Sequence, residues 1–183
     1  RDCLLSRGLG DVYKRQEQGG TVFHDHLFAN EEGAAKIKLN SWEAAVLAEE
    51  QKRVDYVCWL RNPPRQSWSL RVHYEMDGMN KEMFPDFIVV RRDKELGYVL
   101  DILEPHSPDF KDNLGKAKGL AKYAENEPRI GRIQLIRIGK DAAGNNRFKR
   151  LDLAKGKIRN KVLVAINNDE LDHIFETDGM FED

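Results

Sequence analysis

Carboxylates and a proline surround two apolar segments in the middle of the chain, within residues 84–106. Asp86 follows Pro85 and opens the first apolar segment, while Asp101 and Glu104 lie near the end of the second. Burying a carboxylate costs free energy unless a cation or hydrogen-bond donors compensate it. Acidic groups that converge inside a sheet are suited to Mg²⁺, which prefers oxygen ligands. The stretch therefore predicts a divalent-metal site.

The two apolar segments, residues 87–90 and 98–100, are rich in Val, Ile and Tyr and flank a polar turn. This pattern predicts two buried antiparallel strands. The second acid of the site has two candidates, because Asp101 lies fifteen positions after Asp86 and Glu104 lies eighteen positions after it. Side chains alternate along a strand, so these two acids face opposite sides unless a bulge intervenes.

A helix is predicted over residues 41–61, after an N-cap at Ser41 or Asn40 and before two consecutive prolines. Glu43 and Glu50 fall on the same stripe as Leu47 by helical spacing. Each is a candidate additional metal ligand. The alternative is a solvated glutamate at the edge of the stripe.

The remaining elements follow from apolar periodicity and capping residues. Their order, which is helix, three antiparallel strands, helix and strand, indicates an α/β fold with a mixed sheet flanked by helices and with C-terminal helices. The expected strands are residues 35–39, 67–75, 130–138 and 148–153, and the expected helices are residues 112–126, 155–166 and 169–177.

The composition places few limits on function. The chain has 183 residues, enough for one domain with a core, and its net charge of −1 gives no overall basic field for nucleic acid. The two cysteines, Cys3 and Cys58, form no metal or disulfide framework, which favours the reducing cytoplasm. No apolar run reaches the roughly 18 residues of a membrane span, so no membrane association is expected.

The chain does not begin with Met, and residues 1–16 resemble translated library-adapter sequence. They are left out of the fold prediction, as a processing segment would be. Residues 17–40 are expected to lead in from an upstream region outside this sequence. Residues 41–183 are expected to form the C-terminal domain of a longer protein.

The position of Pro85-Asp86 at the head of a strand resembles the PD-(D/E)XK nuclease fold. In that family Pro-Asp begins the second strand, and a triplet of an acid, any residue and Lys lies on the third. With Asp101 as the second acid, Leu103 occupies the lysine position, and with Glu104 it is His106. The chain departs from the family pattern in both registers.

Several segments together resemble the C-terminal region of DEAD/DEAH-box helicases related to the type III restriction enzyme Res subunit. The resemblance covers residues 36–176, whereas the nucleotide-binding G-x-x-x-x-G-K-[ST] loop and the Asp-Glu-x-His box are absent from this sequence. No ATP hydrolysis is therefore expected of this chain. The segments are residues 42–43, 59–65, 83–87, 101–106 and 116–121.

The resemblance implies a metal-dependent DNA endonuclease domain that hydrolyses phosphodiester bonds on DNA delivered by an upstream helicase. Asp86 with Asp101 or Glu104 would hold Mg²⁺, with Mn²⁺ as a further possibility. His106 would act as a base, or Lys118 would reach in from the second helix in place of the family lysine.

Further candidates contact DNA phosphates without reading sequence. They are Arg61, Arg65, Lys116, Lys118 and Lys122. The expected partners are DNA, helicase domains of the full-length chain and a DNA-modification subunit.

The alternative to an enzyme is a non-catalytic DNA-binding or scaffold domain with a degenerate nuclease site. Asp86, Glu104 and His106 would then form internal hydrogen bonds or ion pairs, for example with Arg71 or Arg91.

Overall fold

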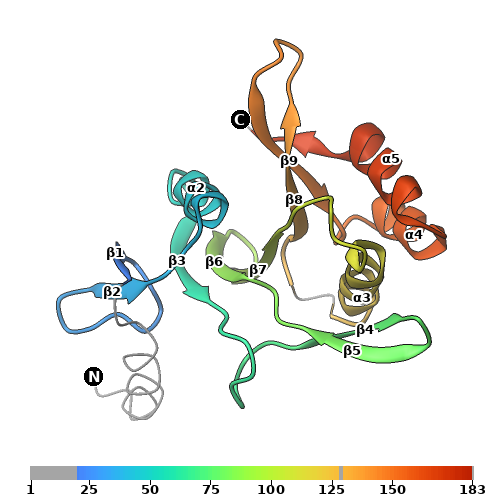
Figure 1. Ribbon diagram of the computed structural model, residues 1–183. Coiled ribbons are helices and arrows are strands. Elements are labelled where there is room, and N and C mark those ends of the chain that lie inside the picture. The colour runs from blue at the N-terminus through green and yellow to red at the C-terminus, as the bar shows by residue number, and fades with distance from the viewer. Residues whose placement is uncertain (1–19, 128–129, 183) are drawn as a thin grey trace.

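The computed structural model describes residues 20–127 and 130–182, so the adapter-like residues 1–16 lie outside the described part. A six-stranded mixed sheet forms its centre (Figure 1). Neighbouring strands are antiparallel except β7 and β8, which are parallel. The strand order is β10 (Met180–Phe181), β9 (Asn146–Asp152), β8 (Ile133–Lys140), β7 (Gly97–Pro105), β6 (Phe87–Asp93) and β3 (Tyr56–Arg61).

Helices cover both faces of the sheet. The helix α2 (Ser41–Glu50) supplies Val46 and Leu47 to one apolar cluster. The helices α3 (Asn113–Asn126), α4 (Gly156–Val164) and α5 (Asn168–Asp178) supply a larger cluster on the other face. The neighbouring residues Ile102 and Leu103 of β7 belong to different clusters, because side chains alternate across a strand.

Two hairpins flank the sheet. The first pairs β1 (Thr21–His24) with β2 (Ala34–Ile37), and the second pairs β4 (Val72–Met76) with β5 (Met79–Met83). Ala35 and Ile37 of β2 are buried in the α2-side cluster. Residues expected to form a lead-in therefore belong to the packed body of the domain.

The coarse sequence prediction is confirmed, since a mixed sheet is flanked by helices and two helices lie near the C-terminal end. The predicted helix over residues 41–61 is wrong in its second half, because α2 ends at Glu50 and residues 56–61 form β3, paired with β6. That apolar stretch is rich in β-formers, and periodicity alone does not distinguish a short buried strand from a helix. The predicted first strand, residues 67–75, instead contributes only to the separate β4–β5 hairpin.

No helix within residues 20–127 and 130–182 is both long and apolar enough to cross a membrane.

The β4–β5 hairpin packs directly on the backbone of α3 at Gly119. A Cβ added there would lie 2.8 Å from the carbonyl oxygen of His73 and 2.8 Å from the Cβ of Tyr74, whereas one added at Gly156 of α4 would meet only an arginine side chain at 3.7 Å. We expect Gly119→Ala to destabilise the fold by about 1–3 kcal/mol through this overlap. Gly156→Ala should instead stabilise it by up to about 1 kcal/mol, since Ala has the higher helix propensity. Urea unfolding of both variants tests this, and equal effects would contradict the close packing.

Candidate functional site

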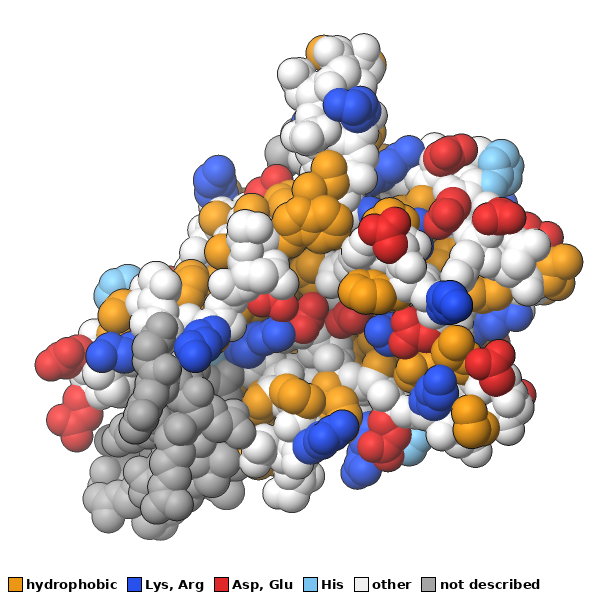
Figure 2. Space-filling view, in the orientation of Figure 1, with side chains coloured by type: hydrophobic (Ala, Val, Ile, Leu, Met, Phe, Trp, Pro, Cys, Tyr) orange, Lys and Arg blue, Asp and Glu red, His pale blue; other side chains and the backbone are white. Residues whose placement is uncertain are grey.

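Five charged residues from five elements meet at one end of the sheet. Arg61 ends β3, Asp86 directly precedes β6, Glu104 lies near the end of β7, Glu43 lies in the first turn of α2, and Lys116 lies near the start of α3. We call these five residues the carboxylate cluster. On the face of the molecule drawn in Figure 2, acidic and basic side chains lie side by side near the middle.

Asp86 and Glu104 lie in direct contact. The backbone N–H of Asp86 donates to Oε2 of Glu104 at 3.0 Å. Burial and the neighbouring charge of Asp86 raise the pKa of the Glu104 carboxyl well above its ordinary value of 4.5. Burial likewise raises the pKa of Asp86. Among the described residues Glu104 forms no ion pair, so its ionised form lacks a directly paired cation.

Arg61 stands between two of the carboxylates. Its guanidinium donates to Oδ1 of Asp86 and, at 3.0 Å, to Oε1 of Glu43. Glu43 is itself fixed by a capping box, in which its Oε2 accepts from the N–H of Asn40 and its own N–H donates to Asn40 Oδ1, each at 2.9 Å. Glu43 therefore lies within the cluster, as the sequence predicted, but it is paired with an arginine.

Lys116 supplies the second positive charge. Its Nζ lies 3.1 Å from Oδ2 of Asp112, and its charge acts to lower the pKa of both Asp86 and Glu104. Lys118, predicted as the substitute for the family lysine, instead lines a groove between α3 and the β4–β5 hairpin. The two residues lie on different sides of α3, and the sequence did not show which side faces the end of the sheet.

His106 is buried next to the cluster but is already engaged. Its Nε2 accepts from Nε of Arg137 at 3.1 Å, and its Nδ1 lies 3.4 Å from the carbonyl oxygen of Glu104. Burial, together with the charge of Arg137, lowers the pKa of His106 to about 3. The Nε2 lone pair that the predicted base would use is thus occupied by Arg137.

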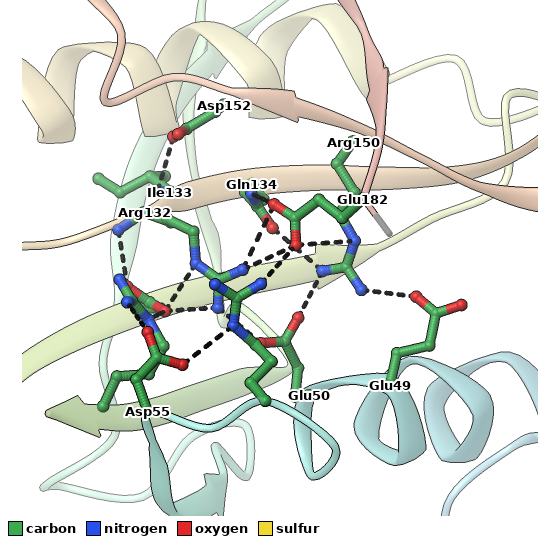
Figure 3. Close-up of polar contacts among 12 residues, drawn as sticks. Glu49, Glu50, Asp55, Arg132, Ile133, Gln134, Arg150, Asp152 and Glu182 are labelled. Carbon is green, nitrogen blue, oxygen red and sulfur yellow. Dashed lines mark hydrogen bonds and ion pairs between the residues drawn. The ribbon is translucent and has the colours of Figure 1, made fainter.

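Asp101 and Glu50 lie in a different set of contacts, and Figure 3 shows Glu50 with Arg132 and Arg150. Asp101 is fully buried and accepts from Arg91 and Arg132. Glu50 accepts from Arg132 and, at 2.6 Å, from Arg150. Because these arginines already compensate both carboxylates, the structure corrects their prediction as metal ligands.

The contacts of Asp101 and Glu50 belong to a larger group of ion pairs, which we call the arginine–carboxylate network. It comprises Glu49, Glu50, Asp55, Asp101 and Glu182 with Arg53, Arg91, Arg132 and Arg150.

The other predicted DNA contacts lie outside the carboxylate cluster. Arg65 is exposed in the segment after β3, with φ of 64°. Lys122 lines the same groove as Lys118. The groove has a volume of about 540 Å³ and is also lined by His73 and Asn80.

A preformed ligand set for a metal ion is absent from the described part of the chain. There, no group of three or more His, Cys, Asp or Glu side chains is placed to hold one. Within the carboxylate cluster, the guanidinium of Arg61 occupies the position between Glu43 and Asp86.

Comparison with known proteins identifies relatives of the chain. The YagJ family matches residues 24–182. The chain belongs to the YagJ family. Protein YagJ of Escherichia coli (strain K12) is 32% identical to it over 151 residues, which are 82% of this chain and 60% of that protein. The chain thus spans less than two thirds of that relative's length, and no solved structure matches it.

The two carboxylates on β7 of this YagJ-family chain should differ in their effect on stability. Asp101→Asn removes the buried carboxylate that Arg91 and Arg132 share, while Asp55 and Glu50 still pair with these arginines, and it should cost about 1–3 kcal/mol. Glu104→Gln removes a charge that no ion pair compensates, and should leave stability near neutral pH unchanged or increased. Urea unfolding measures both, and a similar loss in the two variants would contradict the difference in compensation.

The pH dependence of stability should report the raised pKa of Glu104. A folded-state pKa above the ordinary value favours folding at low pH, and this contribution is lost as pH rises through the folded pKa. Glu104→Gln stays neutral throughout. Its stability relative to the wild type should therefore rise as pH increases above 4.5 and level off above the raised pKa. Glu125→Gln, an exposed control on α3, should show no such rise in the same pH series of urea titrations.

Proposed function

We propose that this domain of the YagJ family is a metal-dependent DNA endonuclease with a PD-(D/E)XK-like core. The element order α2, β3, β6, β7, α3 and β8, with β8 parallel to β7, supports this proposal. The predicted order had residues 67–75 as its first strand, whereas β3 takes that place and β4 and β5 form a separate hairpin between β3 and β6. A restriction-endonuclease-like fold is part of the proposal.

The observation that carries the proposal is the hydrogen bond from the backbone N–H of Asp86 to the Glu104 carboxylate, which brings the two acidic residues together at one end of the sheet. The buried carboxylate of Glu104 and the half-buried carboxylate of Asp86 repel each other, and Glu104 has no paired cation among the described residues. Such a pair fits a divalent ion with oxygen ligands, Mg²⁺ or Mn²⁺, better than it fits an empty interior. Asp86 and Glu104 would hold the ion, with Glu43 beside them.

The bound ion would polarise the phosphate and lower the pKa of the attacking water. Lys116 places its positive charge beside the same carboxylates, where it would stabilise negative charge developing on the phosphate. Lys116 thus takes the role that the sequence assigned to Lys118. His106 keeps its strand end in place through Arg137 and takes no part in proton transfer.

The surroundings of the site supply candidate phosphate contacts. Arg61 lies in the cluster, Arg65 is exposed after β3, and Lys122 lines the groove beside α3. Because the net charge is −1, binding would depend on such local positive groups and weaken with salt. Helicase domains elsewhere in the full-length protein, a DNA-modification subunit and a cytoplasmic location belong to the same proposal.

A second candidate is a non-catalytic DNA-binding or scaffold domain. The pairing of Arg61 with both Glu43 and Asp86 favours it, because internal ion pairs satisfy those two acids without a metal. The engagement of His106 by Arg137 favours it too. The contacts found differ from those predicted for this alternative, since Arg71 pairs with Glu82 and Arg91 with Asp55 and Asp101.

Nicking of supercoiled plasmid DNA distinguishes the two candidates. The wild-type chain with Mg²⁺ or Mn²⁺ should nick the plasmid. Asp86→Asn, Glu104→Gln and Lys116→Met should each lower the rate by about 10²-fold or more, since each removes a group at the reacting phosphate. Lys118→Met is the matched control on the same helix and should stay within about threefold of the wild type.

An inactive wild type that binds duplex DNA, and that shows no calorimetric binding of Mn²⁺, would favour the scaffold. Equal losses in Lys116→Met and Lys118→Met would contradict the assignment of Lys116.

A further inference from the structure

The backbone of Arg61 is held in place, while its side chain reaches the surface. Arg61 pairs with Phe87 in the register of β3 and β6, and its N–H donates to Nε2 of the buried His26 at 3.2 Å. The next residue, Asn62, donates its N–H to the carbonyl oxygen of Asp86 at 2.9 Å. The Arg61 side chain is 22% exposed, so its guanidinium can move to solvent without disturbing the strand.

The guanidinium and a divalent ion would be drawn to the same carboxylates. Arg61 donates to Oδ1 of Asp86 and to Oε1 of Glu43, and its charge also acts on Glu104. A metal ion held by Asp86 and Glu104 would lie close to the guanidinium, and two neighbouring cations repel each other. The guanidinium therefore competes with the metal for the site.

A phosphate offers the guanidinium an alternative partner. Arg binds phosphate through two parallel hydrogen bonds, with geometry as good as that of a carboxylate. A DNA phosphate arriving at this end of the sheet could reach Arg61 and Asp86, whose side chains are 22% and 20% exposed, whereas Glu104 is buried. The phosphate would be attracted to the guanidinium and repelled by the carboxylate.

We propose that Arg61 is an exchangeable counter-ion, which occupies the carboxylate cluster in the free protein and transfers to a DNA phosphate on binding, so that Asp86 becomes available to the metal. This inference rests on the proposed function. It makes metal and DNA binding reciprocal: each increases the affinity for the other. The free protein would then bind metal weakly, and cleavage would be confined to protein with DNA bound.

Calorimetric titration of the whole chain with Mn²⁺ in the absence of DNA tests the competition. Arg61→Gln, which keeps hydrogen-bonding capacity but removes the charge, should bind Mn²⁺ about tenfold more tightly than the wild type, within the usual range of coupling between two sites. Arg61→Lys keeps the charge and should resemble the wild type. Arg71→Gln is a matched loss of one charge away from the cluster, and it too should leave the affinity unchanged.

A second titration tests the exchange with Ca²⁺, an oxygen-binding ion, in the presence and absence of a short DNA duplex. The duplex should raise the Ca²⁺ affinity of the wild type and change that of Arg61→Gln little. If Arg61→Gln does not fold, as judged by circular dichroism, the wild-type arm decides alone, since an unchanged affinity overturns the exchange.

The outcomes separate this inference from the proposed function. Mn²⁺ binding that Asp86→Asn abolishes, but that Arg61→Gln does not strengthen, overturns the counter-ion and leaves the metal site standing. The same holds if Arg71→Gln strengthens binding as much as Arg61→Gln, because overall charge would then explain the effect. Absence of metal binding in every variant, with and without DNA, overturns both.

Discussion

The compensation of buried charge on β7 governs how this domain is built. The strand carries Asp101 toward one face of the sheet and Glu104 toward the other, and each carboxylate loses its hydration. On the α2 face, Arg91 of β6 and Arg132, which directly precedes β8, donate to Asp101 and satisfy it. At the other site, Glu104 receives one backbone N–H and the distributed charges of Lys116 and Arg61. One strand thus contains a fully compensated acid that stabilises the fold and an incompletely compensated acid available for a ligand.

Membership of the YagJ family gives the chain relatives, and the geometry suggests what such a domain does. Fold and family do not by themselves fix function, which depends on the chemistry of the carboxylate cluster and its two cations. Arg61 is central to both candidate functions. As a permanent partner of Asp86 it completes a structural ion pair, and as an exchangeable one it links the state of the site to the presence of nucleic acid. The two candidate functions therefore differ in whether the Arg61 side chain moves while its backbone stays fixed.

The sequence predicted the β6–β7 hairpin and α3 because their signals are local, in continuous apolar runs and in the periodicity of the helix. It also placed Asp86, Glu104 and Glu43 among the candidates. It missed β3, whose apolar residues suit a buried strand or a helix equally. It did not choose between Asp101 and Glu104, because that choice depends on which face of the sheet the arginines occupy. It did not distinguish Lys116 from Lys118, because that depends on which side of α3 faces the end of the sheet. The pairing of His106 with Arg137 joins residues 31 positions apart, and no local pattern indicates it.

The arginine–carboxylate network also has a consequence for biosynthesis. Glu182, among the last residues described, accepts from Arg53, which lies 129 positions earlier, and from Arg132 and Gln134. During synthesis the N-terminal side of the chain emerges first, so Arg53 is translated long before Glu182. Contacts of such long separation form slowly and leave partly folded chains open to misassembly. The α2 face of the sheet is thus completed only after nearly all of the described chain has left the ribosome.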